Sequence, residues 1–80
     1  MNISQAVANR IRELLKIYKM TQYKLKQISG LSHDTIKSIM KGKAKGVNLR
    51  TLILISYGFG ISVVDFLNTD AFKYENINID

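Results

Sequence analysis

The sequence contains no cysteine, no proline and only one histidine. Without cysteine the protein has no disulfides and no thiolate chemistry, which suits a reducing, cytoplasmic compartment. Without proline, helices must end at glycines or capping residues. One histidine and six scattered acidic residues offer no catalytic triad, no pair of carboxylates and no metal-ligand cluster. We therefore expect a protein that is not an enzyme and that needs no metal or cofactor.

Long apolar runs are also missing. The uncharged stretch 51–64 is interrupted by Gly58 and Gly60 and is shorter than the ~20 apolar residues of a membrane span. We interpret it as buried core and expect no membrane association. The N-terminus lacks the charged region and apolar run of a signal peptide. Eighty residues are enough for one small domain.

Charge is distributed unevenly along the chain. The formal net charge is +6, and it divides into +9 over residues 1–50 and −3 over residues 51–80. This distribution is consistent with one surface that binds a polyanion and another region that avoids it. Charge alone does not separate a nucleic-acid-binding surface from an ordinary solvated basic face.

Helix-start signals repeat along the sequence. Each consists of a capping residue, an apolar residue before it and an apolar residue four positions after it. The four caps are Thr21, Ser32, Asn48 and Ser62, with the apolar pairs Met20–Leu25, Leu31–Ile36, Val47–Leu52 and Ile61–Phe66. We also expect Ser4 to cap a first helix and Asp65 to complete a capping box with Ser62. Helix ends are expected at Gly30, Gly42 and Gly60. These signals predict an all-α chain with helices at about 4–18, 21–29, 32–41, 48–58 and 62–68.

The short connection at 29–31 matters most for function. Two helices joined so tightly must cross steeply, as in a helix-turn-helix. Helical spacing then turns a set of apolar residues inward: Leu25, Ile28, Leu31, Ile36 and Ile39. It leaves His33, Asp34, Lys37 and Ser38 outward on the third helix. The major groove of B-DNA is ~12 Å wide and admits one helix.

The segment from Arg10 to Leu67 resembles the phage-repressor and Cro-like (Xre-type) helix-turn-helix family. The resemblance rests on the joint spacing of Gln22, Gly30, Ser32, Gly42-Lys43 and Ser62. It implies a compact five-helix lambda-repressor-like DNA-binding domain over residues 1–69, with the helix-turn-helix at helices 2 and 3. By this resemblance Gln22 would bind a phosphate, and His33, Asp34 and Ser38 would read base edges. The loop residues Lys41, Lys43, Lys45 and Asn48 would follow the DNA backbone.

The sequence departs from the family pattern at three places. Lys26 occupies a position that is usually small, at the contact between helices 2 and 3. Leu15 and Met40 stand where the family often pairs an Arg with a Glu, and we expect an apolar contact there. The reading positions carry His-Asp rather than the common Gln or Arg.

The chemistry of the outward residues suggests their roles. Asp34 accepts from cytosine N4, or it complements only the helix dipole. His33 donates to guanine, or it is a solvated surface residue. Thr35, Lys37 and Ser38 are further candidates for base contacts. Additional phosphate contacts are expected from three residues around the start of helix 2: Thr21, Tyr23 and Lys24.

The C-terminal segment 70–80 has two interpretations. It is either a frayed acidic tail or a dimerisation arm that packs on a second copy, and the family resemblance favours the arm. We expect the dimer contact to involve Phe66, Phe72 and Tyr74. A two-fold dimer would place two reading helices ~34 Å apart on DNA.

Three functions follow, in order of preference. The first is a dimeric, sequence-specific repressor of prokaryotic or phage type that binds double-stranded DNA, with no effector-binding domain. The second is an antitoxin-type module that holds a protein partner and binds its own promoter secondarily. The third, a single-stranded nucleic-acid binder, would need exposed aromatics on a basic face. Most aromatics here, including Phe59 and Phe66, are expected in the core, and Tyr23 is the exception.

Overall fold

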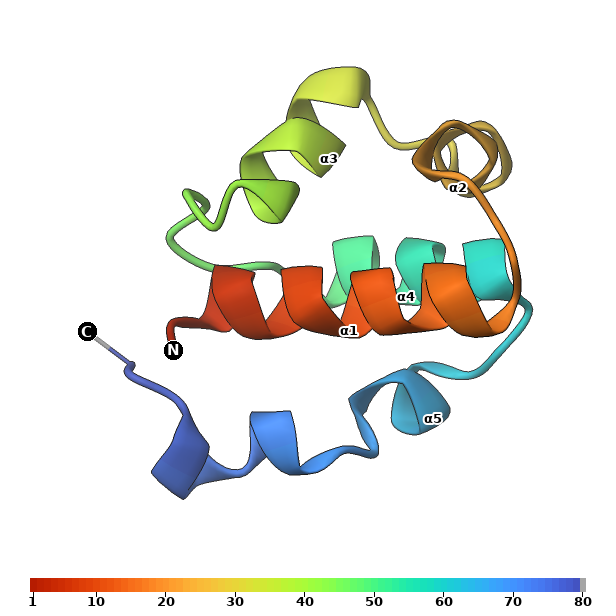
Figure 1. Cartoon of the computed structure of the whole chain (residues 1–80). Helices are drawn as coiled ribbons and strands as arrows, with labels where there is room; N and C mark the ends of the chain where they lie inside the picture. Colours follow the sequence, from red (N-terminus) through yellow and green to blue (C-terminus); the bar gives the residue numbers. More distant parts are fainter. Residues whose placement is uncertain (80) are drawn as a thin grey trace.

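The computed structural model describes residues 1–79, which form five α-helices followed by two 3-10 turns (Figure 1). The helices are α1 (Ile3–Ile17), α2 (Gln22–Ser29), α3 (His33–Met40), α4 (Leu49–Phe59) and α5 (Val63–Leu67), and the turns are η1 (Asp70–Phe72) and η2 (Tyr74–Asn76). The β pairing in this described part is one isolated parallel bridge, between Asn2 and Asn78. The predicted all-α class and helix order are confirmed, and each predicted helix boundary lies within one residue of the observed one.

The four repeated capping signals are confirmed. Each cap side chain accepts a hydrogen bond from the backbone N–H three residues later: Thr21 from Lys24 at 3.1 Å, Ser32 from Thr35 at 3.1 Å, Asn48 from Thr51 at 2.8 Å and Ser62 from Asp65 at 3.0 Å. Gly30 and Gly60 end α2 and α4 with φ of 73°, a conformation that L side chains rarely adopt. Local sequence thus sets where these helices start and stop.

The start of α1 differs from the prediction. Asn2, not Ser4, is the N-cap, and it forms a reciprocal capping box with Gln5. Ser4 is the second residue of the helix and is fully buried. For the predicted box at Ser62, the bond from the Asp65 N–H to the Ser62 hydroxyl is present, but the described contacts include no return bond from the Ser62 N–H to the Asp65 carboxylate. Asn at the N-cap and Gln at the N3 position match the known preferences, so this signal was readable in the sequence.

The core lies between α1 and the other helices. α1 packs on α3, α2 on α4, and α4 on α5, so that α2 and α3 lie on one side of α1 and α5 on the other (Figure 1). Leu25, Leu31, Ile36 and Ile39 are buried as predicted, but Ile28 is 37% exposed. The reason is the close crossing of α2 and α4.

At this crossing Gly58 of α4 approaches α2 closely. A Cβ atom on Gly58 would lie 2.5 Å from a Leu25 methyl carbon and 3.6 Å from the Ser29 Cβ. The inward face of α2 is therefore set by Leu25 and Ser29, which are one turn apart. Ile28 falls at the edge of that face, which explains its exposure.

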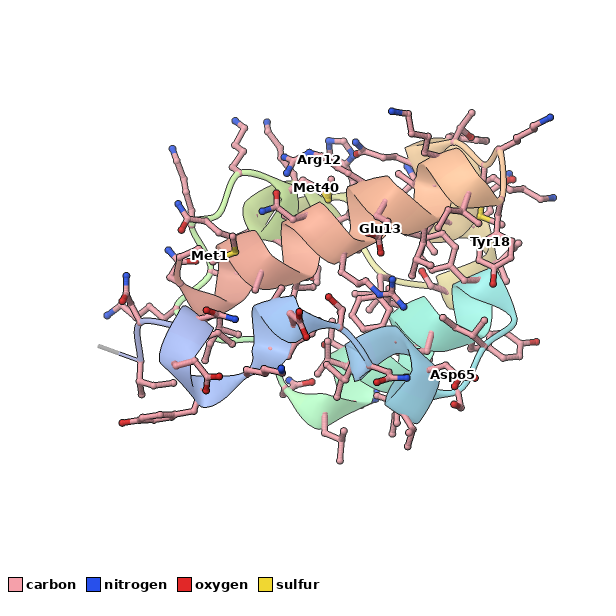
Figure 2. The ribbon with its side chains drawn as sticks, turned by 60° about the horizontal axis from the view of Figure 1, so that its bottom comes forward. Met1, Arg12, Glu13, Tyr18, Met40 and Asp65 are labelled. Carbon is pink, nitrogen blue, oxygen red and sulfur yellow. The ribbon has the colours of Figure 1, made fainter. Side chains whose placement is uncertain are left out.

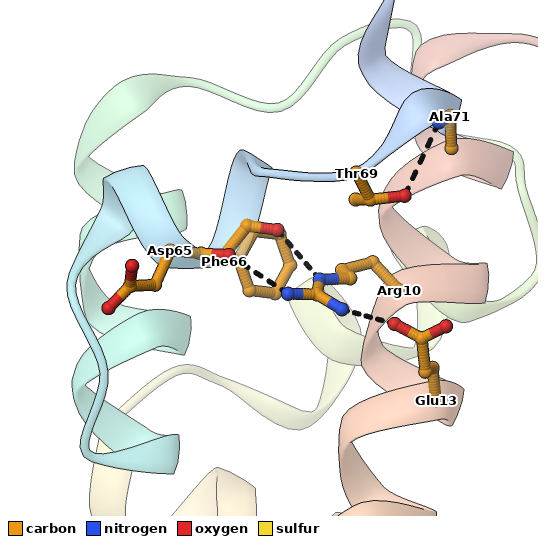
Figure 3. Close-up of polar contacts among 6 residues, drawn as sticks. All are labelled: Arg10, Glu13, Asp65, Phe66, Thr69 and Ala71. Atoms are coloured by element: carbon orange, nitrogen blue, oxygen red, sulfur yellow. Dashed lines mark hydrogen bonds and ion pairs between the residues drawn. The ribbon is translucent and has the colours of Figure 1, made fainter.

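Arg10 attaches α5 to α1 (Figure 3). Its guanidinium donates from Nε to the Phe66 carbonyl at 2.7 Å and from Nη2 to the Asp65 carbonyl at 2.9 Å. Its Nη1 forms an ion pair with Glu13. The Arg10 side chain is 14% exposed, so these bonds lie largely out of water. They supply a partner for the Phe66 carbonyl in the last turn of α5 and a second bond for the Asp65 carbonyl, which also accepts from the Asn68 N–H.

The C-terminal segment folds back on its own chain. The Phe72 ring lies 6.2 Å from the Phe66 ring, centroid to centroid. The Asn78 N–H donates to the Met1 carbonyl at 2.8 Å, next to the bridge with Asn2. Residues 70–79 therefore contact their own chain and are not a frayed tail, while packing of this segment on a second copy stays a prediction. Asp80, which belonged to both interpretations, lies outside the described residues.

Candidate nucleic-acid interface

The third helix projects its polar side chains outward, as the sequence predicted. Leu31, Ile36 and Ile39 anchor it in the core, while His33 and Asp34 in its first turn are exposed. The Ser32 hydroxyl caps the helix and also lies 2.8 Å from the Thr35 hydroxyl. The exposed N-terminal turn of α3 is therefore held in a fixed conformation.

A groove of about 440 Å³ separates α3 from α2. Its basic and polar rim consists of Gln22, Tyr23, Lys26, His33, Lys37 and Lys41, and its apolar floor of Ile36 and Met40. His33, Lys37 and Lys41 recur every four residues, so they form one row along α3. This edge of α3 presents hydrogen-bond donors and positive charge.

A second groove, of about 420 Å³, separates α3 from the loop that precedes α4. The α3 residues that line it are Asp34, Thr35, Ser38 and Ile39, and they face Ala44, Gly46, Val47, Asn48 and Thr51. Asp34 and Ser38 are one turn apart on this edge. The second edge of α3 thus presents acceptors and hydroxyls, in contrast to the basic first edge. The five predicted base-reading residues divide between the two edges.

Tyr23 stands out at the start of α2. It is 62% exposed, and its hydroxyl accepts a hydrogen bond of 3.1 Å from the Gln27 side chain. The Lys26 ammonium lies 5.3 Å from the centre of the Tyr23 ring, within cation–π range. Lys26 is half-buried, so its stem runs along the protein while its charge reaches the groove. The Tyr23 hydroxyl hydrogen remains available to donate to an acceptor such as a phosphate.

The remaining predicted phosphate-binding residues lie on the two segments that flank α3, namely α2 with its N-cap and the loop between α3 and α4. Lys24, Lys43 and Lys45 are exposed on α2 and on the loop after α3. Thr21 and Asn48 cap α2 and α4, where unpaired backbone N–H groups attract anions. Accepting one bond as a cap leaves each side chain a donor of its own.

The predicted dimerisation residues separate into three environments. Phe66 is 0% exposed inside the core, so its expected role at a dimer contact is wrong. It turned inward because it is the fourth residue after the Ser62 cap and packs under the Arg10 contact. Phe72 is half-buried against Phe66, and Tyr74 is 82% exposed.

A different apolar surface is exposed on α4 and α5. Leu49, Ile53 and Tyr57 recur at every fourth position along α4, and all three are exposed. Val64 on α5, which packs against α4, is 72% exposed. We call these four residues the α4–α5 surface. The interpretation of the whole stretch 51–64 as buried core was therefore wrong at Ile53, Tyr57 and Val64, because one face of α4 and α5 points outward.

Sequence reasoning also missed Lys26 and Met40 as groove residues. Lys26 was noted only as a departure from the family pattern, although its charge beside a reading helix was a usable signal. Within residues 1–79, no group of three His, Asp or Glu side chains lies close enough together to bind a metal ion. The helices of this part are also too short or too polar to cross a membrane.

Comparison with known proteins adds two findings. Residues 10–71 match the family described as the Cro/C1-type HTH DNA-binding domain. Over 75 residues the chain is 32% identical to "Control protein C.SmaI" of Serratia marcescens, a match that covers 94% of this chain and 88% of that protein. No solved structure gave a match.

Proposed function

Because this chain belongs to the Cro/C1-type helix-turn-helix family, a non-enzymatic family of DNA-binding regulators, we propose that it is a dimeric, sequence-specific transcriptional repressor. It reads the major groove of double-stranded DNA with α3, and it acts in the cytoplasm of a prokaryotic host. The observation that carries the proposal is the exposed first turn of α3, held by its Ser32 cap between two polar grooves.

The two edges of α3 suit different base edges. His33 and Lys37 are donors, and in the major groove guanine offers the acceptors N7 and O6. Asp34 lies on the other edge and accepts from the amino group of cytosine. Ser38 and Thr35 adapt as donors or acceptors, and the Thr35 methyl suits thymine. A helix that offers donors along one edge and acceptors along the other selects a half-site containing both guanine and cytosine.

The phosphate contacts flank the reading helix. Thr21, Gln22, Tyr23 and Lys24 hold one strand at the start of α2, and Lys41, Lys43, Lys45 and Asn48 hold the other side through the loop. Each neutralised phosphate makes the logarithm of the affinity fall more steeply with the logarithm of the salt concentration, by about 0.9. The acidic residues of α5 and its following segment lie beyond α1, away from α3 (Figure 1). This separation of charge orients the protein toward DNA.

The dimer contact lies on the α4–α5 surface, extended by Phe72 and Tyr74. Tyr57 and Val64 place exposed apolar side chains on neighbouring helices, and the stretch that carries them has no charge between Thr51 and Val64. Two copies that each carry a net +6 meet there with little repulsion. In a two-fold dimer the two copies of α3 lie ~34 Å apart, one turn of DNA.

A tail that orders only with a protein partner would favour the antitoxin alternative. Residues 70–79 instead pack on their own chain through Phe72 and Asn78, which favours the repressor. The single-strand alternative needs stacking platforms on the basic face. All four tyrosines are exposed, so the prediction that Tyr23 is the exception among buried aromatics is wrong. Of the four, Tyr23 is the one that lines the groove between α2 and α3.

Selection of bound duplexes from a random-sequence DNA pool tests the proposal. We expect an inverted repeat whose half-sites are about one helical turn apart and contain both G and C. Salt-sensitive binding without enrichment would contradict sequence-specific reading. Enrichment of single, unpaired half-sites would contradict the dimer, and sedimentation of the free protein at the same concentration provides an independent check.

A further inference from the structure

The C-terminal end of α3 is held by side chains from α1. Ser4 Oγ donates to the Ile39 carbonyl at 3.1 Å, and Arg12 Nη2 donates to the Met40 carbonyl at 2.7 Å. Asn2 Nδ2 donates to the carbonyl of Gly42, just past the helix, at 3.3 Å. Figure 2 shows Arg12 beside Met40, above the α1 ribbon. Three donors from α1 and its N-cap residue thus converge on the end of α3 and the residues just past it.

These bonds have a physical reason to form. The last carbonyls of a helix have no next turn to supply their partners, and they carry the negative end of the helix dipole. The Ile39 carbonyl also accepts from the Gly42 N–H at 2.9 Å, so the bond from Ser4 is a second bond to that oxygen. The Arg12 guanidinium brings positive charge to that end, and its Nη1 also donates to the Asn9 side chain at 3.1 Å. Ser4 is fully buried, so its bond faces no competition from water.

The same end of α3 carries residues proposed to contact DNA. Ser38, a base-reading candidate, and Lys41, a phosphate-contact candidate, flank Ile39 and Met40 and line the two grooves on either side of α3. α3 has eight residues, about two turns, so a tilt at its C-terminal end moves its N-terminal turn as well. α1 has 15 residues and forms the longest rigid element in the described chain.

We propose that Asn2, Ser4 and Arg12 form a clamp that sets the angle and depth at which α3 enters the major groove. They are positioning residues for base reading, which rests on the proposed function of α3. All three bonds of the clamp end on backbone carbonyls.

A competing role for Arg12 is a direct phosphate contact, because the residue is exposed. The two roles differ in salt dependence. A phosphate contact strengthens binding to every DNA sequence and makes the affinity more sensitive to salt. A positioning residue strengthens binding only to the sequence whose bases are read.

The experiment compares Arg12→Gln and Ser4→Ala with two matched controls. Lys16→Gln removes an equal charge from the exposed face of the same helix. Ser56→Ala removes a buried hydroxyl that donates to the Leu52 carbonyl of its own helix, at 2.7 Å. Each protein is titrated against the selected operator and against a scrambled duplex of equal length, at several salt concentrations. Circular dichroism confirms that every variant is fully folded at the assay temperature.

We expect Arg12→Gln and Ser4→Ala each to weaken operator binding about tenfold, roughly the discrimination of one base contact. Binding to the scrambled duplex and the salt slope should stay at wild-type values, and both controls should match the wild type. Equal loss on both duplexes for Arg12→Gln, with a slope lower by about 0.9, would replace the clamp role of Arg12 by a phosphate contact.

A second measurement needs no DNA. Backbone amide NMR shifts of residues 33–40 should move in Arg12→Gln and Ser4→Ala but not in the controls. Wild-type operator affinity together with unmoved α3 shifts in both variants would overturn the clamp. A wild-type protein that selects no operator would instead overturn the proposed function, and with it the role of the clamp in reading.

Discussion

Replacing Arg10 by alanine tests what holds α5 on the domain. Its guanidinium donates to two carbonyls in the last turn of α5, and its side chain is only 14% exposed. A hydrogen bond from a charged donor contributes about 1.5–3 kcal/mol. The second bond counts for less, because the Asp65 carbonyl also accepts from the Asn68 N–H. We therefore expect Arg10→Ala to lower the free energy of unfolding by about 2–4 kcal/mol.

This loss is large for so small a domain. At roughly 0.05–0.15 kcal/mol per residue, a chain of this length is stable by about 4–12 kcal/mol. Each kcal/mol shifts the melting temperature by about 4–8 °C in a domain of this size. The midpoint should therefore fall by roughly 10–30 °C. Urea unfolding followed by circular dichroism gives the free energy, and thermal unfolding gives the midpoint.

Two further variants separate the carbonyl bonds from the ion pair. Arg10→Lys keeps the charge but has no planar fork for two carbonyls, so we expect about half the loss. Glu13→Gln removes only the ion pair, whose carboxylate side chain is 53% exposed, and it should cost less than about 1 kcal/mol. If Glu13→Gln cost as much as Arg10→Ala, or if Arg10→Ala were neutral, carbonyl capping would not be what anchors α5.

Three other changes test the packing, the reading helix and the dimer surface. Gly58→Ala should lower the free energy of unfolding, measured by urea titration, by about 1–2 kcal/mol, because the clash with the buried Leu25 methyl outweighs the better helix propensity of alanine. Gly46→Ala is the control: no atom lies near the added methyl, so its free energy of unfolding should be nearly unchanged. Lys43→Gln should weaken binding to all duplexes about equally and lower the salt slope by about 0.9, whereas Ser38→Ala should change the sequence that repeated selection enriches. Val64→Glu should raise the dimer dissociation constant in sedimentation at least tenfold while the helical circular dichroism is kept, and an unchanged mass would move the dimer contact elsewhere.

The sequence by itself determined where most helices start and stop. Capping bonds join residues three apart, as from the Thr35 N–H to Ser32, so a short stretch of chain contains both partners. A left-handed turn at Gly30 is equally local. The separation of α3 residues into an anchored face and an exposed face followed from helical spacing alone. The same patterns located most of the proposed DNA-contacting residues, because these residues lie on helices 2 and 3 and the loop after them, between residues 21 and 48.

Only the tertiary structure decided which residues far apart in the chain meet. The α2–α4 crossing at Gly58 left Ile28 at an exposed edge, and the docking of α5 under Arg10 buried Phe66. The bond from Arg12 to the Met40 carbonyl joins residues 28 positions apart, and no local sequence pattern predicts it. Such contacts depend on the angles and distances at which whole helices pack. Those are set by the fit of many side chains at once, which local hydrogen bonding does not encode.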